Sequence, residues 1–170
     1  APGGSTSHAP GLVQKVTGNK TLAAMADQTI NKLLTVSNSD GPGFYQVGSL
    51  EIATTPQRLK ELHRRTAWLQ AYGYEAEVVS PERAAELHPV LDATKILGAI
   101  HCPTDGIAKG VRAVEALQKI AESRGAIFKD RTEVISIEQE AGQVTGVMTD
   151  QGFFPAEILV SCAGIWGPKV

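Results

Sequence analysis

The chain has 170 residues and a formal net charge of −2, with 42% hydrophobic and 20% charged residues. This composition is typical of a folded globular protein rather than a disordered one, and the lack of a basic excess argues against a nucleic-acid partner. The longest aliphatic run, Ile158-Leu159-Val160, is too short to span a membrane. Cys102 and Cys162 stand in unrelated contexts, and we interpret them as reduced thiols of a cytoplasmic protein.

The first part of the chain is predicted to form a loop, a helix and a strand. Residues 1–19 are rich in Gly, Ser and Pro, which is typical of a loop. Apolar residues at helical spacing predict a helix over 20–36, and the turn residues of 37–43 end it. The partly alternating, β-branched stretch over 44–55 predicts a strand or a hairpin.

Two helices with the same start signal come next. Thr55-Pro56 and Ser80-Pro81 each combine a capping hydroxyl with a proline at the first helical position. The first of these helices is predicted over 56–72, and the second is short and ends before Pro89. A strand is then predicted over 96–103.

The last part of the chain is predicted to end in a meander and a buried strand. A helix is expected over 107–124, followed by a short strand at 126–128. Strands at 132–139, at 143–150 and from Phe153 onward are separated by short turns, so they should form an antiparallel meander. The continuous apolar run around 157–161 predicts a strand buried on both faces, as in a parallel sheet.

Few side chains point to chemistry by themselves. His8 stands alone in the polar stretch GGSTSHAPG, where it is either a solvated residue or a point of chemical attachment. His63 and His88 are expected to be solvated or to cap helices, and His101 and Cys102 either line a pocket or pack. Asp105 is expected to be a turn or helix N-cap residue. No spacing of His and Cys indicates a metal site, and the catalytic residues stay unassigned.

Four stretches, in this order along the chain, carry a family resemblance: GGSTSHAPGLV at 3–13, LEIATT at 50–55, PTDG at 103–106 and VSCAGIWG at 160–167. Together they resemble the FAD-dependent amine oxidoreductases of the D-amino-acid-oxidase superfamily, especially the branch of the dimethylglycine and sarcosine dehydrogenases and oxidases. The resemblance implies that His8 binds FAD covalently, through the 8α-carbon of the isoalloxazine. It further implies that a set of neighbouring and strand-end residues contacts the cofactor: Ser5, Thr6, Ser7, Leu12, Val134, Ala163 and Gly164.

The resemblance also implies a fold class, an incomplete α/β FAD-binding domain with an antiparallel meander, plus part of a substrate domain. Residues 1–40 and 104–170 would belong to the FAD-binding domain, and 41–103 to the substrate side. The G-x-G-x-x-G unit of dinucleotide-binding folds does not occur. We therefore expect an internal fragment that by itself binds no FAD, and that covers the apolar edge at 158–160 by self-association or by another segment.

The implied activity is oxidation of a small N-methylated, glycine-type secondary or tertiary amine by hydride transfer to FAD. The alternative is a non-catalytic α/β domain of the same fold that binds a ligand or a partner chain. The sequence leaves open which amine is used, which acceptor reoxidises the flavin and whether folate takes part.

Overall fold

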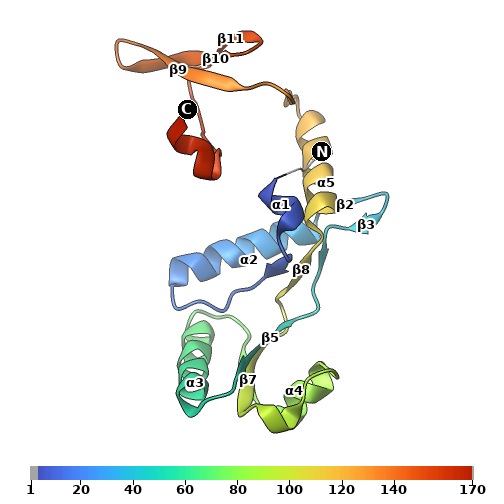
Figure 1. Ribbon diagram of the computed structural model, residues 1–170. Helices are drawn as coiled ribbons and strands as arrows, with labels where there is room; N and C mark the ends of the chain where they lie inside the picture. The colour runs from blue at the N-terminus through green and yellow to red at the C-terminus, as the bar shows by residue number, and fades with distance from the viewer. Residues whose placement is uncertain (1–3, 170) are drawn as a thin grey trace. The chain divides into compact units, whose positions relative to one another are not determined.

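The computed structural model describes residues 4–169, and the chain divides into two compact units, Ala1–Arg124 and Gly125–Val170 (Figure 1). Within the described range, no helix is long and apolar enough to cross a membrane. Every strand pairing in that range is antiparallel. The structure is thus a mixture of helices and antiparallel sheets.

The first unit contains a three-stranded sheet of order β1-β8-β4, accompanied by three helices and a short hairpin. The strands are β1 (Leu12–Val13), β8 (Gly106–Ala108) and β4 (Phe44–Tyr45). The helices are α1 (Ser5–His8), α2 (Lys20–Leu34) and α5 (Gly110–Glu122), and the hairpin joins β2 (Ser37–Asn38) to β3 (Gly41–Pro42).

A second three-stranded sheet in the same unit has the order β5-β7-β6. Its strands are β5 (Ser49–Ala53), β7 (Gly98–Cys102) and β6 (Glu77–Val79). The helices α3 (Pro56–Ala71) and α4 (Pro81–Leu87) flank the sheet, and a 3-10 turn, η1 (Ala93–Lys95), leads into β7 (Figure 1). Thr55 and Ser80 cap the two helices through their side-chain oxygens, as the sequence predicts.

Alternation along β7 divides the hydrophobic core of this sheet between its two faces. Ile100 and Cys102 pack into one cluster with Leu62 and Leu69 of α3. Ala99 packs into a second cluster that includes Ala84 of α4. Successive side chains of a strand point to opposite faces, so a helix covers each face and the central strand is buried.

Four charged residues fasten α3 to β5 in a closed ring. Arg58 contacts both Glu51 and Glu61, and Arg65 contacts the same two carboxylates. The Arg58 and Arg65 contacts to Glu61 each measure 2.6 Å between nitrogen and oxygen. The hydrogen bond from Arg58 is the main cause that lowers the pKa of the Glu61 carboxyl.

The second unit is built on the predicted antiparallel meander of order β11-β10-β9. Its strands are β9 (Val134–Glu140), β10 (Gln143–Thr149) and β11 (Gly152–Pro155), and a 3-10 helix, η2 (Gly164–Lys169), follows. Ala141 and Gly142 turn the chain between β9 and β10 with φ of 51° and 79°. The left-handed pair matches the twist of a tight hairpin.

Two of the predicted strands are wrong. Residues 126–128 and 157–161 have no strand pairing, and Ile127, Ile158 and Val160 are 81%, 84% and 77% exposed. A strand needs a neighbour for its backbone N–H and C=O groups, and the sheet of the second unit is made by β9, β10 and β11 alone. The expected parallel burial of the apolar run is therefore absent from the described residues.

Several segments differ from expectation, most of them because strands pair with partners far away in the sequence. The predicted loop over 1–19 contains α1 and β1, and the helix expected from 107 begins at Gly110 because 106–108 form β8 between β1 and β4. The stretch 44–55 forms neither one strand nor a hairpin, since β4 and β5 belong to different sheets. The strand β6 was not predicted.

Candidate functional site

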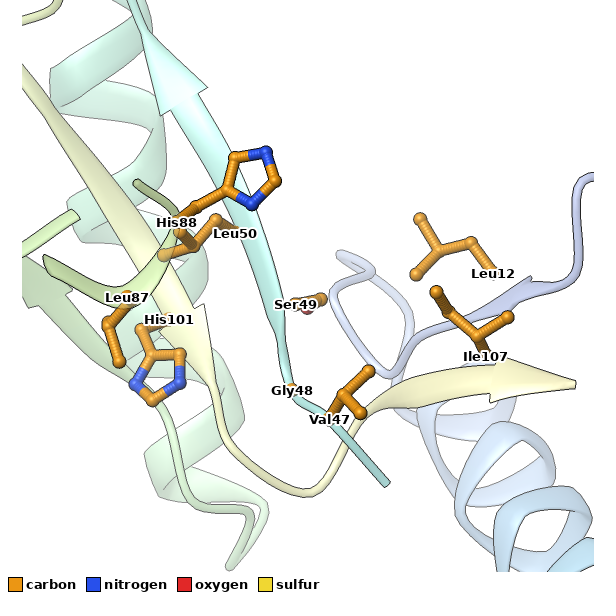
Figure 2. Close-up of a pocket in the computed structure, with 9 residues that line it drawn as sticks. All are labelled: Leu12, Val47, Gly48, Ser49, Leu50, Leu87, His88, His101 and Ile107. Atoms are coloured by element: carbon orange, nitrogen blue, oxygen red, sulfur yellow. The ribbon is translucent and has the colours of Figure 1, made fainter. Parts of the chain in front are cut away.

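A pocket of about 390 Å³ opens between the two sheets of the first unit. Figure 2 shows its two sides: Leu12, Val47 and Ile107 form one wall, and Leu50, Leu87, His88 and His101 form the other. Gly48 and Ser49 lie where the walls meet. The aliphatic residues that dominate the lining, with a few polar groups among them, are typical of a small-molecule site.

The first wall comes from the sheet of β1 and β8. Leu12 of β1 pairs directly with Ile107 of β8, and these side chains are 52% and 39% exposed. Val47, in the link from β4 to β5, is 67% exposed. Exposed aliphatic side chains along one side of a pocket favour a ligand that can pack an apolar part of its surface against them.

The second wall is set by strand register. Leu50 of β5 and Glu77 of β6 both pair with His101 of β7. Residues directly opposite each other in a sheet point to the same face, so the three side chains form a row across the sheet. Within this row, His101 Nδ1 lies 3.4 Å from a Glu77 carboxylate oxygen. The His101 side chain is 15% exposed and Glu77 is 63% exposed.

Gly48 keeps the end of the His101 ring uncovered. The residue has a φ of 78°, in the left-handed region that favours glycine, and a Cβ built on it would lie 3.2 Å from His101 Nε2. A side chain at this position would therefore press on the imidazole from the pocket side. The absence of one lets β5 begin at Ser49 close beside His101.

Asp105 joins the elements behind the pocket. Its Oδ1 accepts a hydrogen bond from the main-chain N–H of Lys15 at 3.1 Å, and its Oδ2 accepts one from the Ser49 hydroxyl at 2.7 Å. Its carbonyl oxygen accepts the N–H of Gly48 at 2.9 Å. The expected turn is confirmed, since the Asp105 N–H donates to the Cys102 carbonyl oxygen at 3.2 Å. The alternative of a helix N-cap is wrong, because α5 begins at Gly110 and the buried Asp105 side chain binds Ser49 and Lys15 instead.

Burial changes the acidity of two groups in this region. Desolvation raises the pKa of the Asp105 carboxyl above its usual range, while the hydrogen bonds from Ser49 and Lys15 oppose the shift. Burial also raises the pKa of the Cys102 thiol to about 12, with a smaller contribution from Asp105. Cys102 is therefore an inert packing residue, one of the two readings that the sequence left open.

His8 is the last residue of α1, the short helix that precedes the Leu12 wall. All four residues of α1, including Ser5, Thr6 and Ser7, are exposed. The helix rests on the start of α5: a Cβ built on Gly110 would lie 2.8 Å from the carbonyl oxygen of Thr6. Gly11 allows a similar approach, since its Cβ would lie 2.4 Å from the carbonyl oxygen of Ala108.

The remaining predicted site residues lie in the second unit. Val134 begins β9 and is half-buried, Ala163 is half-buried, and the exposed Gly164 begins η2. The structure thus brings Leu12 into the pocket and places α1 beside α5, while Val134, Ala163 and Gly164 form no part of that pocket. Between residues 4 and 169 no group of three or more His, Cys, Asp or Glu side chains is arranged to hold a metal ion.

Among known protein families, the model described as FAD dependent oxidoreductase matches residues 1–170, the whole chain. The chain belongs to the FAD-dependent oxidoreductase family. Relatives in this family include the mouse mitochondrial pyruvate dehydrogenase phosphatase regulatory subunit, 34% identical over 96% of this chain. Mouse mitochondrial sarcosine dehydrogenase is 29% identical and human mitochondrial dimethylglycine dehydrogenase 31% identical, each over 98% of this chain. The chain spans only 19–20% of the length of these relatives.

Several solved structures share the fold of this chain. L-proline dehydrogenase from P. horikoshii superposes with a TM-score of 0.88 at 24% identity, over 96% of this chain and 44% of that protein. Glycine oxidase from Geobacillus kaustophilus gives a TM-score of 0.76 at 22% identity, over 98% of this chain and 47% of that protein. The predicted fold class is confirmed by these matches together with the family assignment.

The residues around α1 fit the cofactor of the FAD-dependent oxidoreductase family. The His8 imidazole is exposed at the end of α1, and no described residue forms a hydrogen bond with it. An imidazole in this state is a suitable nucleophile for covalent attachment. The half-exposed Leu12 follows on the same segment, and its aliphatic surface suits a flat aromatic ring system.

Sequence reasoning missed the roles of two residues in and behind this site and left the role of a third open. Gly48 and Asp105 act through contacts with strands that are distant in the sequence, and no local pattern reveals them. For His101 the sequence left two readings open, and the structure shows that it lines the pocket. The signal that would have resolved the choice is the register that aligns Glu77, His101 and Leu50.

Proposed function

We propose that this chain is part of a flavoenzyme that oxidises an N-methyl group of a glycine-type secondary or tertiary amine. The observation that carries the proposal is the largely aliphatic pocket, whose first wall begins at Leu12, just after the segment that bears His8. Similarity to proteins named sarcosine dehydrogenase and dimethylglycine dehydrogenase over 98% of this chain supports this choice of substrate class.

We further propose which residues hold FAD. His8 would carry it covalently, next to Ser5, Thr6, Ser7 and Leu12. Val134 would contact the adenine end of the cofactor, and Ala163 and Gly164 would lie beside the FAD. In this proposal residues 1–40 and 104–170 belong to the FAD-binding domain and 41–103 to the substrate side. The separate sheet that β5, β7 and β6 form with α3 and α4 supports this division over 49–102, whereas β4 pairs with β8 of the proposed FAD-binding side.

When bound, FAD supplies an acceptor for the hydride that leaves the methyl carbon. The chain's own residues orient the amine. Leu12, Val47 and Ile107 pack against its methyl groups and exclude water. His88 and His101 of the opposite wall are the polar side chains near the nitrogen. Once the nitrogen has lost its proton, loss of hydride from the methyl carbon leaves an iminium ion, which water converts to formaldehyde and the demethylated amine.

Acid precipitation of the full-length protein tests the covalent attachment. The flavin colour should stay with the precipitate of the unaltered protein and move to the supernatant in His8→Ala, because that substitution removes the attacking nitrogen. His63→Ala is the matched control, since His63 is an exposed histidine on α3. Flavin that stays with the precipitated His8→Ala protein would show that another residue forms the bond. Release of formaldehyde from sarcosine or dimethylglycine tests the reaction itself.

A second candidate function is favoured by one comparison. A relative with 34% identity over 96% of this chain is named a regulatory subunit, which fits a non-catalytic domain that keeps the fold and binds a ligand or a partner chain. A colourless full-length protein that releases no formaldehyde from either amine would favour this candidate. A yellow protein that demethylates sarcosine or dimethylglycine would rule it out.

Three expectations stay predictions. One is a cytoplasmic location, and another is that the 170-residue chain alone binds no FAD. The third is self-association through the segment at 158–160. Exposures of 84% for Ile158 and 77% for Val160 support this third prediction. Sedimentation of the purified 170-residue chain, with and without FAD, tests the second and third together.

A further inference from the structure

The Glu77–His101 pair gives the pocket a polar group of defined direction. A carboxylate can only accept hydrogen bonds, so the Nδ1 of His101, 3.4 Å from Glu77 Oε1, is the nitrogen that donates. In the neutral imidazole the other nitrogen, Nε2, is then an acceptor. The carboxylate thereby determines which tautomer the ring adopts.

The acceptor nitrogen lies on the pocket side of the ring. Nε2 is the atom that a side chain at position 48 would meet, and Gly48 provides none. The direct neighbour of His101 on β5 is Leu50, whose aliphatic side chain cannot form a hydrogen bond with the imidazole. His101 lines the pocket, and no described residue forms a hydrogen bond with its Nε2. The row Glu77–His101–Leu50 therefore leaves one hydrogen-bond acceptor available to a ligand.

We propose that His101 Nε2 accepts a hydrogen bond from the protonated nitrogen of the substrate amine, with Glu77 as the residue that positions the ring. The proposal rests on the function proposed above, and it makes His101 a determinant of specificity for amines. Methyl groups on the same nitrogen would then face Leu12, Val47 and Ile107 on the opposite wall. The charged groups and ionisable side chains around His101 are Glu77 on β6, His88 after α4, and Asp105 behind the sheet.

A pair of matched ligands tests this hydrogen bond by equilibrium binding to the full-length protein. Dimethylglycine carries an N–H where 3-methylbutanoate, which has nearly the same shape and the same carboxylate, carries a C–H. Because a hydrogen bond with a charged partner is a strong one, we expect dimethylglycine to bind at least about tenfold more tightly than 3-methylbutanoate. His101→Phe keeps a ring but has no acceptor, so we expect the preference to be lost. Glu77→Ala, at a largely exposed residue, should reduce the preference for dimethylglycine at least about threefold, because the His101 ring can then adopt either tautomer.

His63→Ala is the control, because it removes an exposed histidine of α3 that does not line the pocket, and it should leave the preference within about twofold. His88→Ala tests whether the other histidine of the same wall carries the preference instead. The proposal is overturned if the unaltered protein does not distinguish the two ligands, or if the loss follows His88→Ala rather than His101→Phe and Glu77→Ala. If His101→Phe does not fold, an unchanged preference in Glu77→Ala overturns it. Any flavin is reduced with dithionite beforehand, so that it cannot accept hydride and binding is measured without turnover. A protein that prefers the amine but neither holds flavin nor oxidises the amine would then refute only the proposed function.

Discussion

Gly11 holds the segment that carries His8 against β8, and its replacement by alanine should loosen that contact. The residue has a φ of 89°, and a Cβ there would lie 2.4 Å from the carbonyl oxygen of Ala108. The same two residues share a hydrogen bond, from Ala108 N–H to the Gly11 carbonyl oxygen, at 2.7 Å. The obstructing atom belongs to the backbone, so one of the two strands must move.

Gly73→Ala separates the two costs of this substitution. Gly73 has a φ of 85°, but its Cβ would meet nothing within 4 Å, so alanine there costs only the left-handed backbone penalty of about 1–2 kcal/mol. Gly11→Ala carries that penalty and, in addition, the overpacking cost of about 1–3 kcal/mol. The two penalties together, about 2–5 kcal/mol, predict that local opening of β1 and β8 increases at least about 30-fold in Gly11→Ala relative to the unaltered protein, since 1.4 kcal/mol is a factor of ten.

Hydrogen exchange followed by mass spectrometry measures this opening in the full-length protein. Peptides that cover β1 and β8 should exchange faster in Gly11→Ala and at an unchanged rate in Gly73→Ala, since Gly73 follows α3. The covalent flavin fraction should fall in Gly11→Ala alone, because His8 loses its fixed position. Exchange of β1 and β8 within about twofold of the unaltered protein would refute the reasoning.

Three further predictions concern the core of the first unit. Leu62→Ala, at a fully buried residue, should lower the free energy of unfolding by about 2–5 kcal/mol in a urea titration. The control Leu97→Ala, at a residue that is 45% exposed, should leave the free energy of unfolding within about 0.5 kcal/mol of the unaltered protein. Iodoacetamide at about pH 8 should label the exposed Cys162 and leave the buried Cys102 unmodified until the protein unfolds, because burial raises the pKa of the Cys102 thiol to about 12. Equal labelling of the two cysteines in the folded protein would contradict this prediction. In the folded protein, burial raises the pKa of the Asp105 carboxyl above the ordinary value of 3.8 that it has in the unfolded chain. Between the ordinary and the raised pKa the folded protein therefore binds more protons than the unfolded one, and the free energy of unfolding falls as the pH rises. Asp105→Asn lacks this ionisation, and its Tm relative to the unaltered protein should therefore rise from about pH 4 to about pH 7; a constant difference would contradict the assignment.

Local signals in the sequence were sufficient to predict the meander and every described helix from α2 to α5, though not α1. The caps at Thr55 and Ser80 involve residues within one helical turn, so the sequence pattern contains the whole interaction. The turn at Ala141-Gly142 likewise depends only on its neighbours. Each of these elements was predicted close to its observed bounds.

Elements that depend on distant partners were not predictable in the same way. β8 exists because Ile107 pairs with Leu12, and Asp105 is buried because it binds Lys15, 90 residues away. The apolar run around Ile158 has strand-like composition, but burial needs a partner strand that the described residues do not provide. The pocket combines both cases: its Leu12 wall follows a recognisable motif, while Gly48 and His101 gain their roles from register alone.

The charged ring of Glu51, Arg58, Glu61 and Arg65 makes the attachment of α3 to β5 redundant on the helix side only. Arg58 and Arg65 each touch Glu51, the one member of the ring on β5, and each also touches Glu61 on α3. Loss of either arginine therefore still leaves the other bound to Glu51, whereas loss of Glu51 removes every ion pair of the ring that joins the two elements. Homologous chains can thus lose one arginine and recover it later while α3 stays in register with the strand that forms the pocket wall, but the carboxylate at position 51 has no substitute within the ring.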